Sequence, residues 1–196
     1  MAAARAGDGP ASSTGRPPRR NTTDPDSRLM KNKSKGFLQG FNAQVAVSDD
    51  HLIVATDVTC SSNDMNSFIP MMDLAVASVS THLPGGADIG TLLADAGYCS
   101  SDNLTSPGPD RLIATGRDPA KPSVKEPIQK MADRLAHDSP DRVIYRRRQA
   151  IVEPVIGHLK DRIGLRRFTR RGLQAARHEL ASVSYTHLTL PTIYSV

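Results

Sequence analysis

Two acidic residues in this sequence of 196 residues have the surroundings that divalent-metal chemistry needs. Asp95 directly follows the apolar run TLLA, which predicts a buried strand that delivers a carboxylate at its carboxyl end. Glu153 lies beside the apolar stripe of a predicted helix. Because hard cations prefer oxygen ligands, carboxylates from a strand end and a facing helix can share Mg²⁺ ions with substrate phosphates.

Each acid also has a purely structural interpretation. Asp95 stands two residues before Gly97 and could be a turn residue at the end of a strand. Glu153 lies among arginines and precedes Pro154, so it could be a salt-bridged surface residue or a partner of a helix dipole. Spacing alone favours this structural interpretation.

The positive charge of the chain is concentrated near its carboxyl-terminal end. Residues 142–171 hold ten Lys or Arg and only two acids, Glu153 and Asp161, whereas the net charge of the whole chain is +5. The rest of the chain is therefore slightly acidic. This asymmetry predicts a surface for a polyanion, of which the phosphate backbone of nucleic acid is the commonest. The alternative is a solvated basic face of a helix.

Composition indicates one domain with unpacked ends. Hydrophobic residues make up 38% and aromatic residues 4%, with 14 prolines and 14 glycines. Residues 1–20 lack apolar periodicity, so we expect a disordered lead-in rather than a signal peptide. We expect no membrane partner, because no run is long and apolar enough to span a bilayer. Cys60 and Cys99 lie far apart and suggest neither a zinc site nor a disulfide, which fits the cytoplasm.

Periodicity predicts an α/β layer fold with a mixed sheet. Alternating residues predict a hairpin of two strands, and helical spacing with Pro70 in the first turn or at a kink predicts a helix. Ser62, Asn63 and Asp64 are possible caps of this helix. The expected elements are strands at 41–47 and 52–58, a helix at 65–79, strands at 91–94 and 111–115, and helices at 128–135 and from about 142.

Four segments together resemble bacterial insertion-sequence transposases of the DDE class. In chain order they are NTTDPDSRLMKNKSKGFLQGFNAQVAV, LADAGYCSSDNL, RLIATGRD and YRRRQAIVEPVIGHLKDRIGLRRFTRRGL, and they cover about residues 21–181. The resemblance implies a ribonuclease-H-like catalytic domain, a mixed sheet with flanking helices. It also implies that the domain binds the inverted repeats at the element ends and cuts and joins DNA with Asp, Asp and Glu around two Mg²⁺ ions.

Transferred by motif, Asp95 corresponds to the second acid of this triad and Glu153 to its glutamate, both as metal ligands. We expect Tyr98 and His158 to serve in packing or DNA contact. The resemblance implies a cytoplasmic, nucleoid-associated enzyme that forms a homo-oligomer when intact. Its partner is double-stranded DNA, at the transposon ends and at the target, and the residues expected to contact the DNA are Arg146, Arg147, Arg148, Lys160, Arg166, Arg167, Arg170 and Arg171.

This sequence has no acid at the position where the family carries the first acid of the triad. In the family it lies on a strand upstream of TDPDSRLM, and nothing before Asn21 resembles that strand. Asp24 and Asp26 fall in the connecting segment, and the motif around Asp57 matches the neighbouring strand. We therefore expect an incomplete ribonuclease-H-like sheet without its first strand, and a fragment that cleaves no DNA by itself.

The final residues, SYTHLTLPTIYSV, depart from the apolar helix that the family has there. One back-translation of residues 183–192 resembles a transposon mosaic-end adapter used in preparing sequencing libraries. We therefore hypothesise that residues 183–196 are a non-native, adapter-derived tail; the alternative is a natural terminus. The expected organisation is a lead-in at 1–20, a partial catalytic domain at 21–182 and this tail.

Two other functions fit the sequence. The chain could be a non-catalytic DNA-binding remnant that uses only the basic helix at 142–171 and binds DNA with strong salt dependence. It could also be a basic structural or RNA-associated protein. The scarcity of aromatic residues disfavours the latter, because RNA-binding surfaces stack bases on aromatic side chains.

Overall fold

A computed structural model describes residues 21–32, 36–82, 88–116 and 124–189. The expected lead-in at 1–20 lies outside the described residues, as do residues 190–196 of the expected tail. The longer elements are β1 (Arg28–Asn32), β2 (Gly36–Gly40), β3 (Asn42–Val47), β4 (Ile53–Thr59), α1 (Phe68–His82), β5 (Thr91–Ala94), α2 (Ser101–Thr105), β6 (Asp110–Ile113), α3 (Glu126–Arg134), α4 (Pro140–Asp161) and α5 (Leu173–Thr189). Two short 3₁₀ helices, η1 (Asp64–Ser67) and η2 (Ala96–Tyr98), precede α1 and follow β5.

The strands form three separate pairs. β1 and β2 pair in antiparallel orientation, as do β3 and β4, whereas β5 and β6 are parallel. The strand directions of a mixed sheet are therefore present, but the expected single sheet is not. Within the described residues β3 pairs only with β4, and β5 pairs only with β6. No described strand joins them, so the second edge of each pair stays open.

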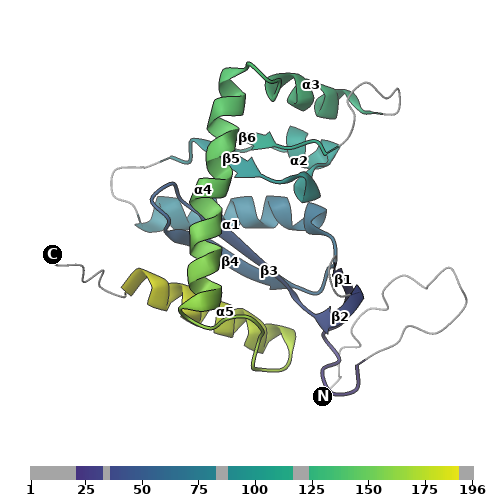
Figure 1. Ribbon diagram of the computed structural model, residues 1–196, viewed down its shortest axis with the longest axis vertical. Helices are drawn as coiled ribbons and strands as arrows, with labels where there is room; N and C mark the ends of the chain where they lie inside the picture. The colour runs from purple at the N-terminus through teal and green to yellow at the C-terminus, as the bar shows by residue number, and fades with distance from the viewer. Residues whose placement is uncertain (1–20, 33–35, 83–87, 117–123, 190–196) are drawn as a thin grey trace, which may run out of the picture.

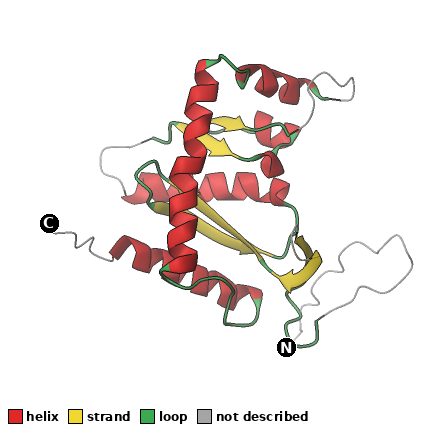
Figure 2. Cartoon of the chain, viewed as in Figure 1, coloured by secondary structure: helices red, strands yellow, loops and turns green. Residues whose placement is uncertain are grey.

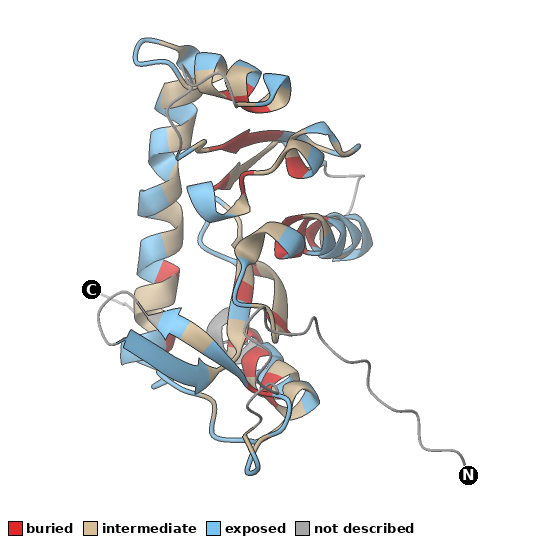
Figure 3. Ribbon diagram, turned by 90° about the vertical axis from the view of Figure 1, so that its right-hand side faces the viewer, coloured by how far each residue is buried: buried red, intermediate tan, exposed pale blue. Residues whose placement is uncertain are grey.

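Helices cover both sides of the strand pairs. Figures 1 and 3 show the long α4 running along one side of β5–β6 and of β3–β4, with α1 on the other side. Figure 2 shows that α4 is continuous over its whole length, although it contains Pro154. The burial colours in Figure 3 place the buried residues between these layers.

One part of the core lies between α1 and the parallel pair. Phe68 and Met72 are one helical turn apart on α1 and pack with Ala94 of β5 and Ile113 of β6. Such i, i+4 spacing places apolar side chains on one helix face. Pro70 is the third residue of α1, in the first turn, where a missing N–H is tolerated. The predicted helix and this position of its proline are confirmed.

A second part of the core joins the β3–β4 hairpin to α4 and α5. Val155 and Leu159 of α4 pack on Ile53 of β4. Ala176 and Leu180 of α5 pack on the fully buried Val58. The side chains of the predicted apolar stripe of α4 therefore do face the hairpin.

The carboxyl-terminal helix α5 runs from Leu173 to Thr189, across the boundary expected at residue 182. Val183 packs against the cluster of Ile53, Val155 and Leu159, and Ser184 is buried and donates its hydroxyl to the backbone oxygen of Leu180 at 2.8 Å. Residues 183 and 184 thus belong to the packed part of the helix.

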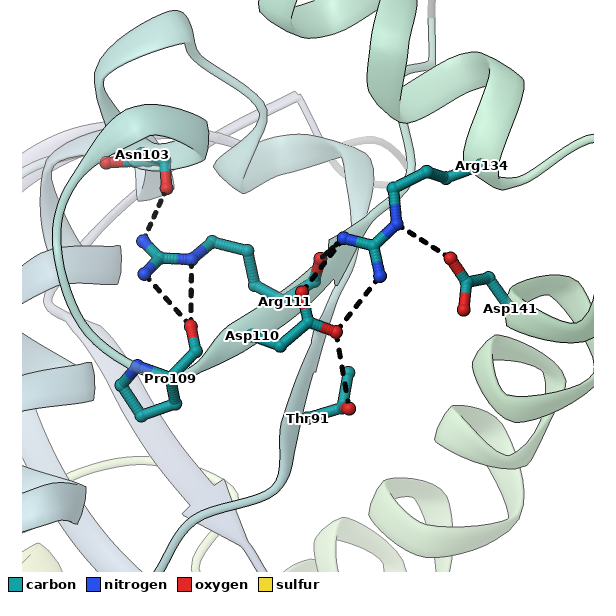
Figure 4. A network of polar contacts seen from close by, with 7 residues as sticks. All are labelled: Thr91, Asn103, Pro109, Asp110, Arg111, Arg134 and Asp141. Atoms are coloured by element: carbon teal, nitrogen blue, oxygen red, sulfur yellow. Dashed lines mark hydrogen bonds and ion pairs between the residues drawn. The ribbon is translucent and has the colours of Figure 1, made fainter.

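The amino-terminal end of α4 is fixed by an arginine network, drawn in Figure 4. Arg134 of α3 donates from Nη1 to Asp110 Oδ1 at 2.8 Å and from Nε to Asp141 Oδ2 at 2.7 Å. Asp110 lies on β6, and Asp141 lies in the first turn of α4. One guanidinium group therefore connects β6, α3 and α4, which sets the direction in which α4 crosses the fold.

Candidate functional site

Asp95 stands where β5 ends. Its backbone is extended, and its carboxylate accepts a hydrogen bond from the backbone N–H of Gly97 at 2.8 Å, which caps the 3₁₀ helix η2. The side chain is exposed. The prediction of an apolar strand that delivers an acid at its carboxyl end is confirmed, and the cap fixes the direction of that acid.

A second carboxylate, that of Asp64, also lies close to Gly97. A Cβ atom built on Gly97 would lie 3.0 Å from Asp95 Oδ1 and 3.1 Å from Asp64 Oδ2. Asp64 Oδ1 accepts hydrogen bonds from Asn42 Nδ2 at 2.6 Å and from Gln44 Nε2 at 3.0 Å. The two acids therefore both approach the space that a side chain at residue 97 would occupy, and β3 holds one of them in place.

A partly buried hydrogen bond connects this pair of acids to the core. The hydroxyl of Tyr98 donates to Gln44 Oε1, while the amide group of the same glutamine donates to Asp64. Gln44 is 3% exposed. Burial, followed by the negative charges of Asp64 and Asp95, raises the pKa of Tyr98 to about 12, so the phenol stays protonated at neutral pH. Tyr98 is half-buried and packs against the core beside Phe68, which is one of its two expected roles.

Glu153 is exposed on α4, in the half of the helix that packs on the β3–β4 hairpin. Pro154, which follows it, lies inside the helix rather than in its first turn. α4 contacts both β5, the strand that ends at Asp95, and β3. The fold therefore brings the helix of one predicted metal ligand against the strand of the other.

Three other acids considered for the site are used elsewhere. Asp24 Oδ1 accepts from the backbone N–H of Gly172 at 3.2 Å, and Asp26 Oδ2 accepts from that of Leu173 at 3.0 Å. Asp57 forms an ion pair of 2.8 Å with Arg177 on α5. All three acids therefore stabilise the start and the packing of α5.

The basic residues of α4 line its solvent side. Arg146, Arg147 and Lys160 are exposed, while Arg148 is partly buried with its guanidinium carbon 5.8 Å from the centre of the Tyr145 ring. Arg147 lies 4.0 Å from Asp49 at the surface, a contact worth little in water. These positive charges are therefore available to an anionic partner.

A second basic group lies in the loop between α4 and α5. Arg166, Arg167, Arg170 and Arg171 are all exposed. Arg166 forms an ion pair with Asp161 at the end of α4. The exposed basic residues of the helix and of the loop, on consecutive segments of the chain, are together called the basic surface below.

Comparison with known proteins identifies the family. Residues 13–188 match the transposase DDE domain. The chain belongs to this family. No curated protein and no solved structure matches. The recognition of the chain as a DDE-class transposase from its motifs is confirmed, and DNA transposition is the process in which such a domain takes part.

The transposase family uses divalent metal ions, and the residues of this domain fit such an ion only in part. Carboxylate oxygens such as those of Asp95 and Glu153 are suitable ligands for Mg²⁺. However, the described residues contain no group of three or more His, Cys, Asp or Glu side chains that could hold a metal ion.

In the part of the chain that the structure describes, no helix is long and apolar enough to span a membrane.

Sequence reasoning missed Asp64 and Gln44. Asp64 follows SSN, a pattern that indicates only a possible cap, and the capping side chain is that of Asn63, which accepts from the N–H of Met65 at 3.0 Å. Gln44 alternates with apolar residues in FNAQVAV and looks like a solvent-facing strand residue. Nothing local in the sequence distinguishes it, because its burial depends on η1 and η2 packing over β3.

Proposed function

We propose that this transposase domain cuts and joins DNA strands at the ends of an insertion sequence, with Asp95 and Glu153 as ligands of Mg²⁺. The observation that carries the proposal is the contact between α4, which bears Glu153, and β5, which ends at Asp95. When bound, two such ions supply activation of the attacking oxygen and stabilisation of the leaving oxygen. The protein residues hold the ions and orient the phosphate.

A third carboxylate is needed to complete this site. Asp24, Asp26 and Asp57 are engaged at α5, and the described residues hold no group of three acids. We therefore propose that the chain by itself cleaves no DNA. An extended strand that carries an acid and pairs with the open edges of β3 and β5 would join the strand pairs into one ribonuclease-H-like sheet.

The partner of the basic surface in this proposal is double-stranded DNA, at the element ends and at the target. The exposed Arg and Lys side chains of α4 and of the following loop contact backbone phosphates, which fixes the position of the DNA without reading its sequence. The intact enzyme forms a homo-oligomer, so that two DNA ends can be held together, and acts at the nucleoid in the cytoplasm.

Metal binding and strand cleavage test the catalytic assignment. We expect Mn²⁺ titration followed by calorimetry to show binding that Asp95→Asn and Glu153→Gln each weaken, and that Asp50→Asn, at an exposed turn residue, leaves unchanged. We expect the chain alone to leave a supercoiled plasmid intact in Mg²⁺. Metal binding that both site substitutions leave unchanged would contradict the ligand assignment. Mg²⁺-dependent nicking that Asp95→Asn abolishes would contradict the need for a further acid.

A non-catalytic DNA-binding role is the second candidate function. It is favoured by the exposed arginines, which need no metal site to bind phosphate. Duplex binding that falls steeply with salt, together with no detectable Mn²⁺ binding, would support this role. Under the catalytic proposal, Asp95→Asn and Glu153→Gln each weaken Mn²⁺ binding, whereas under this alternative there is no Mn²⁺ binding for either substitution to weaken.

A further inference from the structure

We propose that residues 166–171 form a preorganised loop for the backbone of double-stranded DNA, and that Glu179 is the residue that sets its shape. This inference rests on the proposed function, because it assigns a specific part of the basic surface to DNA phosphates. It makes an acidic residue a contributor to the binding of a polyanion, which is the opposite of what its charge alone predicts.

The middle of the loop is attached to α5 by the Glu179 carboxylate. The backbone N–H of Thr169 lies 3.0 Å from both carboxylate oxygens, and the Thr169 hydroxyl donates to Oε1 at 2.9 Å. The backbone N–H of Arg170 donates to Oε2 at 3.1 Å. One carboxylate thus satisfies two consecutive peptide N–H groups and a hydroxyl, so the loop cannot change its conformation without losing these bonds.

An aromatic contact fixes the same part of the loop from the other direction. Phe168, the residue before Thr169, meets Phe41 edge to face, with ring centres 6.2 Å apart and an angle of 73° between the planes. It packs on the buried cluster of Val58, Ala176 and Leu180. Aromatic pairs of this geometry stabilise beyond their buried area. The pair Phe168–Thr169 is therefore the anchored centre of the loop.

Both ends of the loop are fixed as well. Gly164 has a φ of +79°, which ends α4, and the N–H of Leu165 turns back to the Leu159 oxygen at 2.9 Å. At the other end Gly172 has a φ of +87°, and its N–H donates to Asp24. The loop is therefore held at its start, at its centre and at its end.

The side chains of four exposed arginines take no part in the anchoring of the loop backbone. They form two pairs, one on each side of the anchored centre: Arg166 with Arg167, and Arg170 with Arg171. Guanidinium groups bind phosphate oxygens in a bidentate manner, and a backbone that is already fixed loses less conformational entropy on binding. A loop of this kind presents its two arginine pairs to phosphates in one orientation.

Glu179 is charged at neutral pH. Partial burial alone would raise its pKa, but the hydrogen bonds from Thr169 and Arg170 outweigh this effect and hold the pKa below its usual range. Asp161 is a second acid beside the same loop, but it pairs with the Arg166 guanidinium group, whereas the N–H groups of Thr169 and Arg170 donate to Glu179. The two acids therefore offer a matched comparison.

The test compares Glu179→Gln with Asp161→Asn, which remove the same charge beside the same loop. Duplex binding is followed by fluorescence anisotropy at several salt concentrations. We expect Asp161→Asn to tighten duplex binding, because Arg166 is released from its ion pair. We expect Glu179→Gln to weaken duplex binding by about fivefold, which corresponds to about 1 kcal/mol. Amide exchange at Thr169 and Arg170 should speed up only in Glu179→Gln, with the helical circular dichroism unchanged in both variants.

Tighter binding by both variants would overturn the inference while leaving DNA binding by the basic surface intact. Absence of duplex binding by the unmodified chain would overturn the DNA-binding part of the proposed function as well. As an independent measure, Arg170→Ala combined with Arg171→Ala should lower the slope of log affinity against log salt by about two. Lys130→Ala on α3 is the control. An equal reduction of the salt slope in this variant would also contradict the assignment of the loop to DNA phosphates.

Discussion

The imidazole Nε2 of His51 lies 3.1 Å from the backbone oxygen of Ala150, the residue four positions before Pro154. In an uninterrupted helix that oxygen would accept the N–H of residue 154, which proline lacks. His51, at a φ of 65° in the turn between β3 and β4, supplies the missing donor. Because a carbonyl oxygen only accepts, Nε2 carries the proton. The turn is thereby attached to α4 beside Glu153.

This relationship predicts that His51 and Pro154 are coupled in stability. His51→Ala should lower the free energy of unfolding by about 1 kcal/mol, the usual net value of one hydrogen bond. Pro154→Ala restores the helical N–H, so the same histidine substitution should matter much less in that background. Urea unfolding of the two single variants and the double variant measures the coupling, and purely additive effects would show that the histidine does not replace the proline's missing donor.

Removing Gln44 should destabilise the fold more than its position in a hairpin suggests. Gln44→Leu removes the acceptor of the half-buried Tyr98 hydroxyl and one of two donors to the Asp64 carboxylate. At the usual net value of about 0.5–1.5 kcal/mol per hydrogen bond, the loss of two lowers the stability by about 1–3 kcal/mol. Chemical denaturation is the measurement, with Gln149→Leu at an exposed position of α4 as the control. If the two variants lose equal stability, the hydrogen bonds of the Gln44 side chain contribute nothing.

Titration of Tyr98 tests whether the negative charge of Asp95 lies close enough to raise the pKa of this phenol. Its pKa of about 12 predicts a late ionisation step in an ultraviolet titration, and Tyr98→Phe should remove this step. The corresponding stability is fully present below pH about 10, the usual tyrosine pKa, and is lost as the pH rises through 12. Asp95→Asn should lower the pKa of Tyr98. Glu153→Gln should not, and a similar shift in both variants would be inconsistent with the geometry.

Acid should weaken the attachment of α4 to β6. The hydrogen bond from Arg134 holds the pKa of Asp110 below its usual range, although partial burial acts in the opposite direction. The stability that Asp110 contributes is therefore present above pH about 4 and is lost as the pH falls through its lowered pKa. Thermal melts between pH 5 and pH 2 should show a shallower decline for Asp110→Asn than for the unmodified chain. Asp50→Asn should follow the unmodified chain, and identical profiles for all three would refute the linkage.

The TDPD motif should act as a cap for a distant helix. Asp26→Ala removes the acceptor for the N–H of Leu173, and loss of such a cap destabilises a helix by about 1 kcal/mol. We expect a lower midpoint of thermal unfolding and faster amide exchange at Leu173. Asp73→Ala, at an exposed position of α1, provides the comparison. Unchanged exchange at Leu173 would show that the cap is not maintained in solution.

Local sequence patterns were sufficient to predict the secondary structure in the middle of the chain. The hairpin predicted at 41–47 and 52–58 corresponds to β3 and β4, and the acid expected at a strand end follows β5. These elements are determined by alternating or helical spacing and by nearby turn residues, which sequence reasoning can detect directly. The assignment of Asp95 and Glu153 as metal ligands depends on motif resemblance and stays a prediction.

The remaining features depend on packing between distant segments. β1 and β2 were not predicted, because Leu29 and Phe37 lie exposed on a hairpin without an alternating apolar face. The approach of Asp64 to Gly97 depends on how η1 meets η2 and has no local signal. The separation of the strands into pairs could not be inferred either, since each strand sequence is compatible with pairing on both edges.

The anchoring of α5 also has a consequence for the order of folding. Its partners Asp24, Asp26 and Asp57 precede their contacts by 148, 147 and 120 residues. Contacts so distant along the chain form late, because a long loop must close before they contribute. At ordinary rates of synthesis, the TDPD segment leaves the ribosome about 7 to 30 s before the helix that it caps. Until then, the hydrophobic side of the β3–β4 hairpin lacks the helix that covers Val58.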